Sequence, residues 1–250
     1  MTVVFAAVGH EFSVAANDSC VLQDFGEHKE YGTGGKHYVV PGAGVVTMWG
    51  GRDGNHLIEH LKARHEALAE QGVDALCSVV DAYLRREFAP HSYGLEDTGY
   101  HVSGYRPDGS PRLYHAFYNG AGSPGAFESN GAYSLQDQSP GRGETRLLYN
   151  GRNDIAHPLV QLLIKEIKER RQTRFPRTPD GLARFAHFVL RFASELSPDV
   201  SPPFFVHLIA ASNRIKTISL EPLTPLAPDY FTPAWQQLVA NQALSPKGSC

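Results

Sequence analysis

The chain has 250 residues, of which 42% are hydrophobic and 20% charged, so it is long enough and apolar enough to bury a globular core. A formal net charge of −3 gives no reason to expect nucleic acid or an anionic membrane as a partner. Three scattered cysteines make neither a disulfide framework nor a cysteine metal site. The composition therefore predicts a cytoplasmic protein with no metal and no cofactor.

The first part of the chain is predicted to form strands. Apolar, β-branched residues over Val3–Val8 and Phe12–Ala16 flank a short polar turn, which indicates a hairpin. Two further short strands are expected over His37–Val40 and Val45–Trp49. No signal peptide is expected, because acidic residues interrupt the first apolar stretch and no Lys or Arg precedes it. No stretch reaches the roughly 18 apolar residues of a membrane span.

Apolar residues repeat at helical spacing in four later segments. The first begins at Asp53, which can cap a helix, and continues to Gly72; the second begins at Asp74. The third begins at Pro158, which the first turn of a helix tolerates, and the fourth spans Pro179–Leu196. The sequence therefore predicts two helix pairs.

Strand patterns lie between and after these helix pairs. Tyr100–Tyr105 and Leu113–Tyr118 flank a Pro-Asp-Gly turn, and Gly131–Leu135 is a further candidate strand. Phe204–Ala211 and Ile215–Leu220 close the pattern. Strands that alternate with helix pairs predict an α+β fold in which helices cover the outer faces of stacked sheets.

The domain organisation follows from where this pattern ends. We expect residues 1–221 to form one domain, and we expect residues 222–250, which are rich in proline, to form an irregular C-terminal extension.

Thr2 is the first residue with catalytic potential. A terminal threonine combines a hydroxyl nucleophile with its own α-amine as the base, whose ordinary pKa is about 7.7–8.0. This chemistry requires the removal of Met1, which aminopeptidases carry out readily before a small side chain. Threonine is also a common second residue, so Thr2 by itself leaves an ordinary chain start as an alternative.

Several motifs around Thr2 carry a resemblance to a known family. They are T-V-V-F-A-A-V at residues 2–8, A-A-N-D-S at 15–19, and G-K-H-Y-V-V-P-G-A-G-V-V-T-M-W-G-G-R-D at 35–53. Together they resemble proteasome β subunits and the related bacterial ATP-dependent peptidase subunit, which are N-terminal-nucleophile (Ntn) hydrolases. The resemblance covers residues 2–220, most clearly over Lys36–Asp53. It implies a four-layer αββα sandwich of two mostly antiparallel sheets.

The resemblance also implies the parts of an active site. Thr2 would be the nucleophile, Lys36 the catalytic lysine, and Asp18 the buried aspartate that anchors this lysine by a charge-assisted hydrogen bond. Gly50 would supply a backbone N–H to the oxyanion hole, because glycine lets the backbone approach the substrate closely.

Other positions match the family less closely. Asn150 stands where the family has a serine that supports the terminal amine. Met48 and Arg52 would line the pocket for the substrate side chain, with Arg52 favouring an acidic group. Asp199 and Ser201 are spaced differently from the family's later aspartate and serine. The segment between Asp18 and Lys36 is slightly longer than is usual in the family.

Three functions are open at this point. The first is a threonine peptidase in a homo-oligomeric ring or stacked rings, with an ATPase partner. The second is a non-catalytic, proteasome-like subunit with a structural or assembly role. The third is an amidohydrolase of acylated small molecules that uses the same threonine. His56 and His60, four residues apart in the first predicted helix, indicate a surface or inter-subunit role rather than a metal site.

Overall fold

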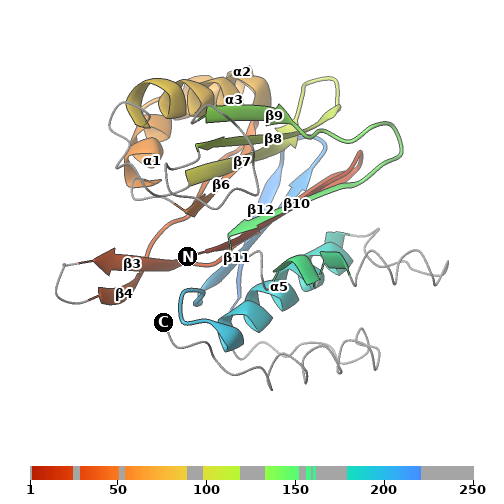
Figure 1. The fold of residues 1–250 in the computed structure, drawn as a ribbon. Helices are drawn as coiled ribbons and strands as arrows, with labels where there is room; N and C mark the ends of the chain where they lie inside the picture. The colour runs from red at the N-terminus through yellow and green to blue at the C-terminus, as the bar shows by residue number, and fades with distance from the viewer. Residues whose placement is uncertain are drawn as a thin grey trace.

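The computed structural model describes residues 2–24, 29–50, 54–88, 98–118, 133–151, 156–158, 160–161 and 179–220. The predicted cap Asp53, the pocket residue Arg52, most of the helix predicted from Pro158, and the extension 222–250 lie outside the described residues. Figure 1 shows the described elements in layers, with helices on the two outer sides and two sheets between them.

The first sheet contains both the first and the last strand of the described chain. Its strand order is β10-β1-β2-β11-β12, and every neighbouring pair is antiparallel. The strands span Val3–Val8 (β1), Phe12–Asn17 (β2), Arg146–Gly151 (β10), Phe204–Ala210 (β11) and Ile215–Leu220 (β12). The predicted hairpin over the first 16 residues forms the centre of this sheet.

The second sheet follows the chain order β5-β6-β7-β8-β9 and is also antiparallel throughout. Its strands span His37–Val40 (β5), Gly44–Gly50 (β6), Thr98–Tyr105 (β7), Pro111–Tyr118 (β8) and Tyr133–Asp137 (β9). The last strand lies two residues later than the Gly131–Leu135 that the sequence predicts.

Helices cover the outer face of each sheet. The second sheet is covered by α1 (Gly54–Lys62), α2 (His65–Gln71), α3 (Val73–Ala82) and the π-helical turn η1 (Tyr83–Phe88), and the first sheet by α5 (Pro179–Leu196). The predicted extent of α5 is confirmed. Together with the two antiparallel sheets, these helices confirm the predicted four-layer αββα sandwich.

The single helix predicted from Asp53 to Gly72 is wrong, because the chain forms two helices there. The break falls at Ala63 and Arg64, between α1 and α2. The Arg64 guanidinium donates a hydrogen bond to the His60 carbonyl at 3.1 Å, so it satisfies a backbone acceptor at the end of α1.

Two strands that the sequence pattern does not predict pair with each other. β3 (Cys20–Asp24) and β4 (Lys29–Thr33) form a hairpin that is separate from both larger sheets and stands to one side of the sandwich in Figure 1. Its base is closed by a hydrogen bond from the Gly34 N–H to the Ser19 carbonyl at 2.8 Å. Asp18 and Lys36 therefore flank a compact insertion.

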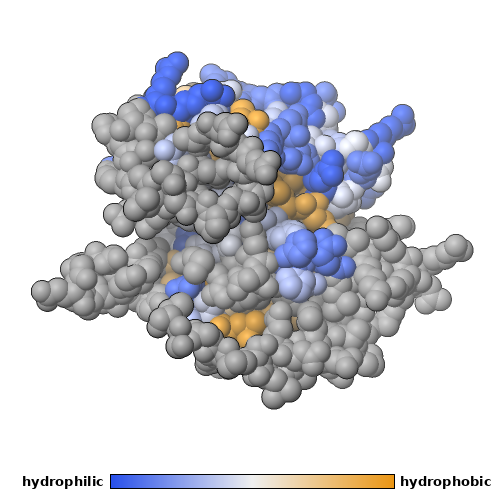
Figure 2. Space-filling model, in the orientation of Figure 1, coloured by the Kyte–Doolittle hydropathy of each residue, from blue (hydrophilic) through white to orange (hydrophobic). Residues whose placement is uncertain are grey.

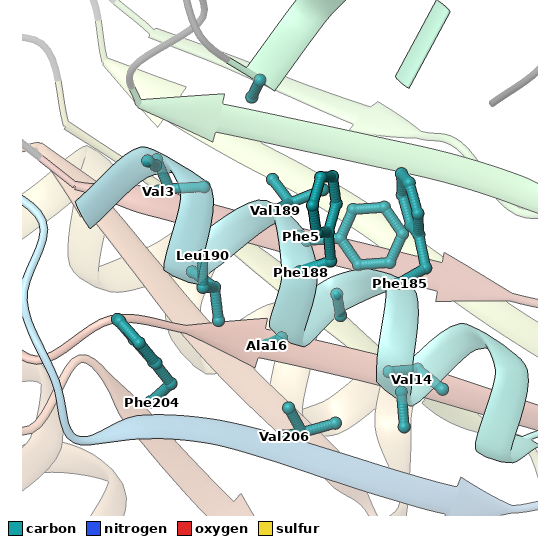
Figure 3. Packing of buried hydrophobic residues seen from close by; sticks show 14 of the residues in the cluster. Val3, Phe5, Val14, Ala16, Phe185, Phe188, Val189, Leu190, Phe204 and Val206 are labelled. Carbon is teal, nitrogen blue, oxygen red and sulfur yellow. The ribbon is translucent and has the colours of Figure 1, made fainter. Parts of the chain in front are cut away.

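The core between α5 and the first sheet is apolar (Figure 3). Alternate residues of β1, such as Val3 and Phe5, point toward this helix, and the Phe5 ring meets the Phe185 ring edge-on at a centroid distance of 5.5 Å. Each fully buried side chain of this kind stabilises the fold by about 1.5–3 kcal/mol. This packing holds the start of the chain in place.

The outer surface differs from these core layers. On the face that Figure 2 shows, hydrophilic side chains cover most of the described surface, with smaller hydrophobic areas between them. Among the described residues, Leu135 is the large hydrophobic side chain that is exposed, at 38%. The described part of the chain therefore places its large apolar side chains mainly in the interior. No described helix is both long and apolar enough to cross a membrane.

The two sheets are also joined by polar contacts at one end of the sandwich. Asn213 follows β11 and is buried; its Nδ2 donates to the carbonyls of Tyr105, at 2.6 Å, and Gly42, at 2.9 Å. The Tyr105 hydroxyl donates to the Gly9 carbonyl at 2.7 Å and accepts from Ser13 at 2.9 Å. These residues close the end of the sandwich at which β1, β5 and β7 finish.

The layer between the sheets contains buried histidines, and we expect them to make the free energy of unfolding depend on pH. Burial lowers the pKa of His101 to about 4 and that of His207 to about 3. The unfolded chain takes up these protons near pH 6.5 and the folded chain only at lower pH, so the free energy of unfolding falls as pH falls from about 6.5 toward 4. Each such histidine contributes a slope of about 1.4 kcal/mol per pH unit.

Urea unfolding measured between pH 7.5 and 4.5 tests this expectation. His101→Gln should flatten the slope by roughly one proton. Equal slopes in wild type and His101→Gln would contradict it.

Candidate functional site

Thr2, Asp18 and Lys36 meet at the end of the sandwich where β1 and β5 begin. The Lys36 ammonium donates one hydrogen bond to Thr2 Oγ1 and another to Asp18 Oδ2, the latter at 2.9 Å. Thr2 immediately precedes β1, Asp18 immediately follows β2, and Lys36 lies next to β5. The lysine therefore links the two sheets, and it brings together three residues that the sequence analysis singles out.

These three side chains are largely shielded from solvent. Asp18 is fully buried, Thr2 is 5% exposed, and the Lys36 side chain is 11% exposed. An ion pair in such a place is strong only if the remaining lone pairs are also satisfied.

Asp18 meets this requirement through backbone donors. Its Oδ1 accepts from the Val3 N–H at 3.0 Å, and its Oδ2 accepts from the Cys20 N–H at 2.9 Å as well as from Lys36. Burial raises the pKa of Asp18, and the Lys36 charge and the two backbone donors oppose this rise. Because all three described partners are donors, the group is held as a carboxylate that orients Lys36 and fixes the start of β1.

The backbone of Thr2 is held by strand β10. Val3 pairs with Gly151, and Gly151 has a φ of 102°, a conformation that favours glycine. A Cβ at Gly151 would lie 1.6 Å from the Thr2 carbonyl oxygen. The absence of a side chain at this position therefore allows β10 to pass directly beside Thr2.

Met48 and Gly50 lie on β6, next to Lys36. The Met48 N–H donates to the Lys36 carbonyl at 2.8 Å, and the Met48 side chain is buried in the apolar cluster beneath α1 that includes Leu57 and Tyr100. Gly50 ends β6, is exposed, and has a φ of 63°. Two of the predicted pocket and oxyanion residues therefore share the strand that flanks Lys36, while Arg52 is outside the described residues.

Asn150 lies on β10, and its side chain forms a hydrogen bond with a residue of the second sheet. Its Oδ1 accepts from His101 Nε2 at 2.7 Å, with both residues buried. The family resemblance places Asn150 at the site, but nothing in the sequence singles out His101, because an isolated histidine in a strand carries no local signal of a partner 49 positions away.

The loop after α5 lies against the residues that follow Asp18. The Ser19 N–H donates to the Ser201 carbonyl at 3.1 Å, and Cys20 Sγ contacts the Pro198 carbonyl at 3.5 Å. Asp199 interacts with Ser197, its N–H at 3.3 Å from the Ser197 hydroxyl. The structure thus brings Ser201 close to the site through its backbone, despite its unusual spacing in the sequence.

Comparison with known proteins identifies structural relatives only. No protein-family model matches the chain, and no curated protein matches its sequence. The solved structures that share its fold include Anbu (ancestral beta-subunit) from Yersinia bercovieri, at 12% identity and a TM-score of 0.56, over 96% of this chain and 93% of that one. The helical assembly of the Anbu complex from Pseudomonas aeruginosa matches at 14% identity and a TM-score of 0.55, over 96% and 92% of the two chains.

A third Anbu structure matches in the same way. It is the Gly-1 mutant from Hyphomicrobium sp. strain MC1, at 12% identity and a TM-score of 0.54, over 97% of this chain and 95% of that one. These neighbours correct the resemblance drawn from the motifs: the assignment to proteasome β subunits or to the ATP-dependent peptidase subunit is wrong, and the structural likeness is to Anbu proteins. At these identities the likeness concerns the fold alone, and the chain has the proteasome-like αββα fold that it shares with the Anbu structures.

Proposed function

We propose that the chain is an N-terminal threonine hydrolase that cleaves amide bonds once Met1 has been removed. The observation that supports this most directly is the hydrogen bond from Lys36 Nζ to Thr2 Oγ1, with Asp18 holding the same lysine from the other side. Besides pairing with Asp18, this nearly buried lysine donates to the threonine hydroxyl, which is the arrangement that an activated hydroxyl nucleophile requires.

In this mechanism the Thr2 hydroxyl attacks the substrate carbonyl and forms an ester. The free α-amine of Thr2 accepts the hydroxyl proton, and this proton then passes to the leaving amine. The Lys36 ammonium stabilises the developing alkoxide, and the Gly50 N–H donates to the oxyanion. Water, deprotonated by the same amine, hydrolyses the ester and regenerates Thr2.

The substrate class follows from this chemistry and from the strand beside Lys36. We assign a peptide or an acylated small molecule to the site, with Met48 and Arg52 at the substrate side chain. Because the Met48 side chain belongs to an apolar cluster, its contribution to that pocket would be apolar.

Assembly is the second part of the proposal. The Pseudomonas aeruginosa neighbour is described as a helical assembly of the Anbu complex. We infer that this chain also forms a homo-oligomer, built from a domain of residues 1–221 that carries the 222–250 extension. Light scattering of the purified protein tests this, and a monomer at micromolar concentration would contradict it.

Labelling of Thr2 tests the catalytic proposal. We expect the mature protein to lack the mass of Met1 and to form a covalent adduct with a peptide boronate or epoxyketone at Thr2. Thr2→Ser should keep the adduct and some hydrolysis, because the hydroxyl remains, whereas Thr2→Ala should lose both by at least about 10³-fold. A mature chain that retains Met1, or equal labelling of Thr2→Ala, would overturn the proposal.

A further inference from the structure

The register of β1 and β10 places Asn150 on the same side of the sheet as Thr2. Asn150 lies directly opposite Val4, so these two side chains share a face. Side chains alternate along a strand, which puts position 2 on the face of Val4 as well. Gly151, opposite Val3, has no side chain, so Asn150 is the first side chain of β10 that can reach the neighbourhood of the Thr2 nitrogen.

His101 determines which end of the Asn150 amide is available there. Its Nε2 donates to Asn150 Oδ1 at 2.7 Å, because an amide oxygen can only accept. His101 is fully buried and Asn150 is 3% exposed, so water offers no easy replacement for this bond. With its oxygen held by His101, the Asn150 amide is fixed in orientation, and its N–H₂ donors point away from His101 toward other partners.

We propose that His101 is a positioning residue for the terminal amine: it holds the Asn150 oxygen and thereby turns the Asn150 N–H₂ group toward the α-amine of Thr2. This inference rests on the proposed function, in which that amine is the general base. A donor facing the amine disfavours an ammonium there and keeps the base neutral. If His101 no longer donated, the Asn150 amide could rotate and present its oxygen, which would stabilise the ammonium.

Among the residues that the structure describes, three other titratable groups lie in this region and have to be accounted for in any test. Lys36 approaches Thr2 from β5, and Asp18 pairs with Lys36 from the end of β2. His115, on β8, lies next to His101 with a ring-centroid distance of 5.1 Å. Substitutions at positions 101 and 150 leave Lys36 and Asp18 with their partners, whereas His115 contacts His101, so the titration of His115 has to be followed alongside that of the amine.

The test compares His101→Leu, which removes the donor, with His101→Gln, which retains an N–H₂ donor. The readout is the pKa of the Thr2 α-amine, measured by NMR titration of Thr2 in protein labelled with ¹³C-threonine. We expect His101→Leu to raise that pKa by about 0.5–1 unit and to shift the acidic limb of the kcat/KM profile upward equally. His101→Gln should stay close to wild type.

Asn150→Asp provides an independent route if His101→Leu does not fold. It places a carboxylate oxygen where an amide nitrogen stood and should raise the amine pKa at least as much. Urea midpoints of all variants report folding separately. An unchanged amine pKa in folded His101→Leu and Asn150→Asp would overturn the inference.

The same experiments separate this inference from the proposed function. If wild-type protein labels at Thr2 but the variants show no shift, only the positioning role of His101 fails. If Met1 is removed and the amine pKa shifts in the variants while Thr2 neither labels nor turns over substrate, the proposed hydrolase activity fails and the positioning role stands. Retention of Met1 in wild type would remove the amine and overturn both.

Discussion

Replacing Lys36 with methionine is expected to lower kcat/KM by at least about 10³-fold, because the alkoxide of Thr2 would lose its charged donor in a site nearly closed to water. The same change leaves the buried Asp18 carboxylate without its counter-charge, so the free energy of unfolding should fall by about 3 kcal/mol. Turnover of a fluorogenic peptide amide and urea unfolding at pH 7.5 measure the two effects.

Two further variants show whether the loss is specific. Lys62→Met removes an exposed lysine paired with Glu59, and it should change neither activity nor stability appreciably. Adding Asp18→Asn to Lys36→Met removes the unpaired charge, which should recover part of the stability but none of the activity. Turnover by Lys36→Met within about tenfold of wild type would show that this lysine is not catalytic.

Gly151→Ala is expected to be the most damaging small substitution near the site. The added Cβ would lie 1.6 Å from the Thr2 carbonyl oxygen, and a φ of 102° is itself strained for alanine. Relief requires β10 or Thr2 to move, so the free energy of unfolding should fall by more than about 3 kcal/mol and Thr2 labelling should drop by at least about 10²-fold. Intact-mass labelling kinetics and urea unfolding measure both.

Gly143→Ala is the matched control for this substitution. Gly143 also has a positive φ, of 77°, but a Cβ there meets nothing within 4 Å. It should therefore cost only the conformational strain, about 1 kcal/mol, and leave labelling unchanged. Equal effects of the two substitutions would mean that backbone strain, not the contact with Thr2, accounts for the loss at Gly151.

The layer order could be predicted from sequence because the elements that define it carry strong local signals. Val3–Val8 is continuously apolar, and Pro179–Leu196 repeats at helical spacing up to its last turn. β3, β4 and β10 were not predictable in this way, because they mix polar and apolar residues and owe their pairing to partners along the sheet. The break between α1 and α2 at Arg64 was also not predictable, because no glycine or proline marks it in the sequence.

The candidate site was predictable to the extent that its residues have chemistry of their own. Thr2, Asp18 and Lys36 stand out by type and order, and the structure brings them together. His101 does not stand out, because its significance depends on facing Asn150 across the two sheets. His56 and His60, which share a helix, attract more notice in the sequence than His101 does.

The far end of the sandwich has a consequence for the distance between Thr2 and Lys36. Thr2 and Lys36 begin strands of different sheets, and Asn213 binds those sheets together where the same strands finish. Sliding of one sheet over the other would break the contacts at both ends. The two sheets are therefore pinned at opposite ends, by Asn213 at one and by Lys36 at the other, and both sets of hydrogen bonds help to fix the separation of Thr2 and Lys36.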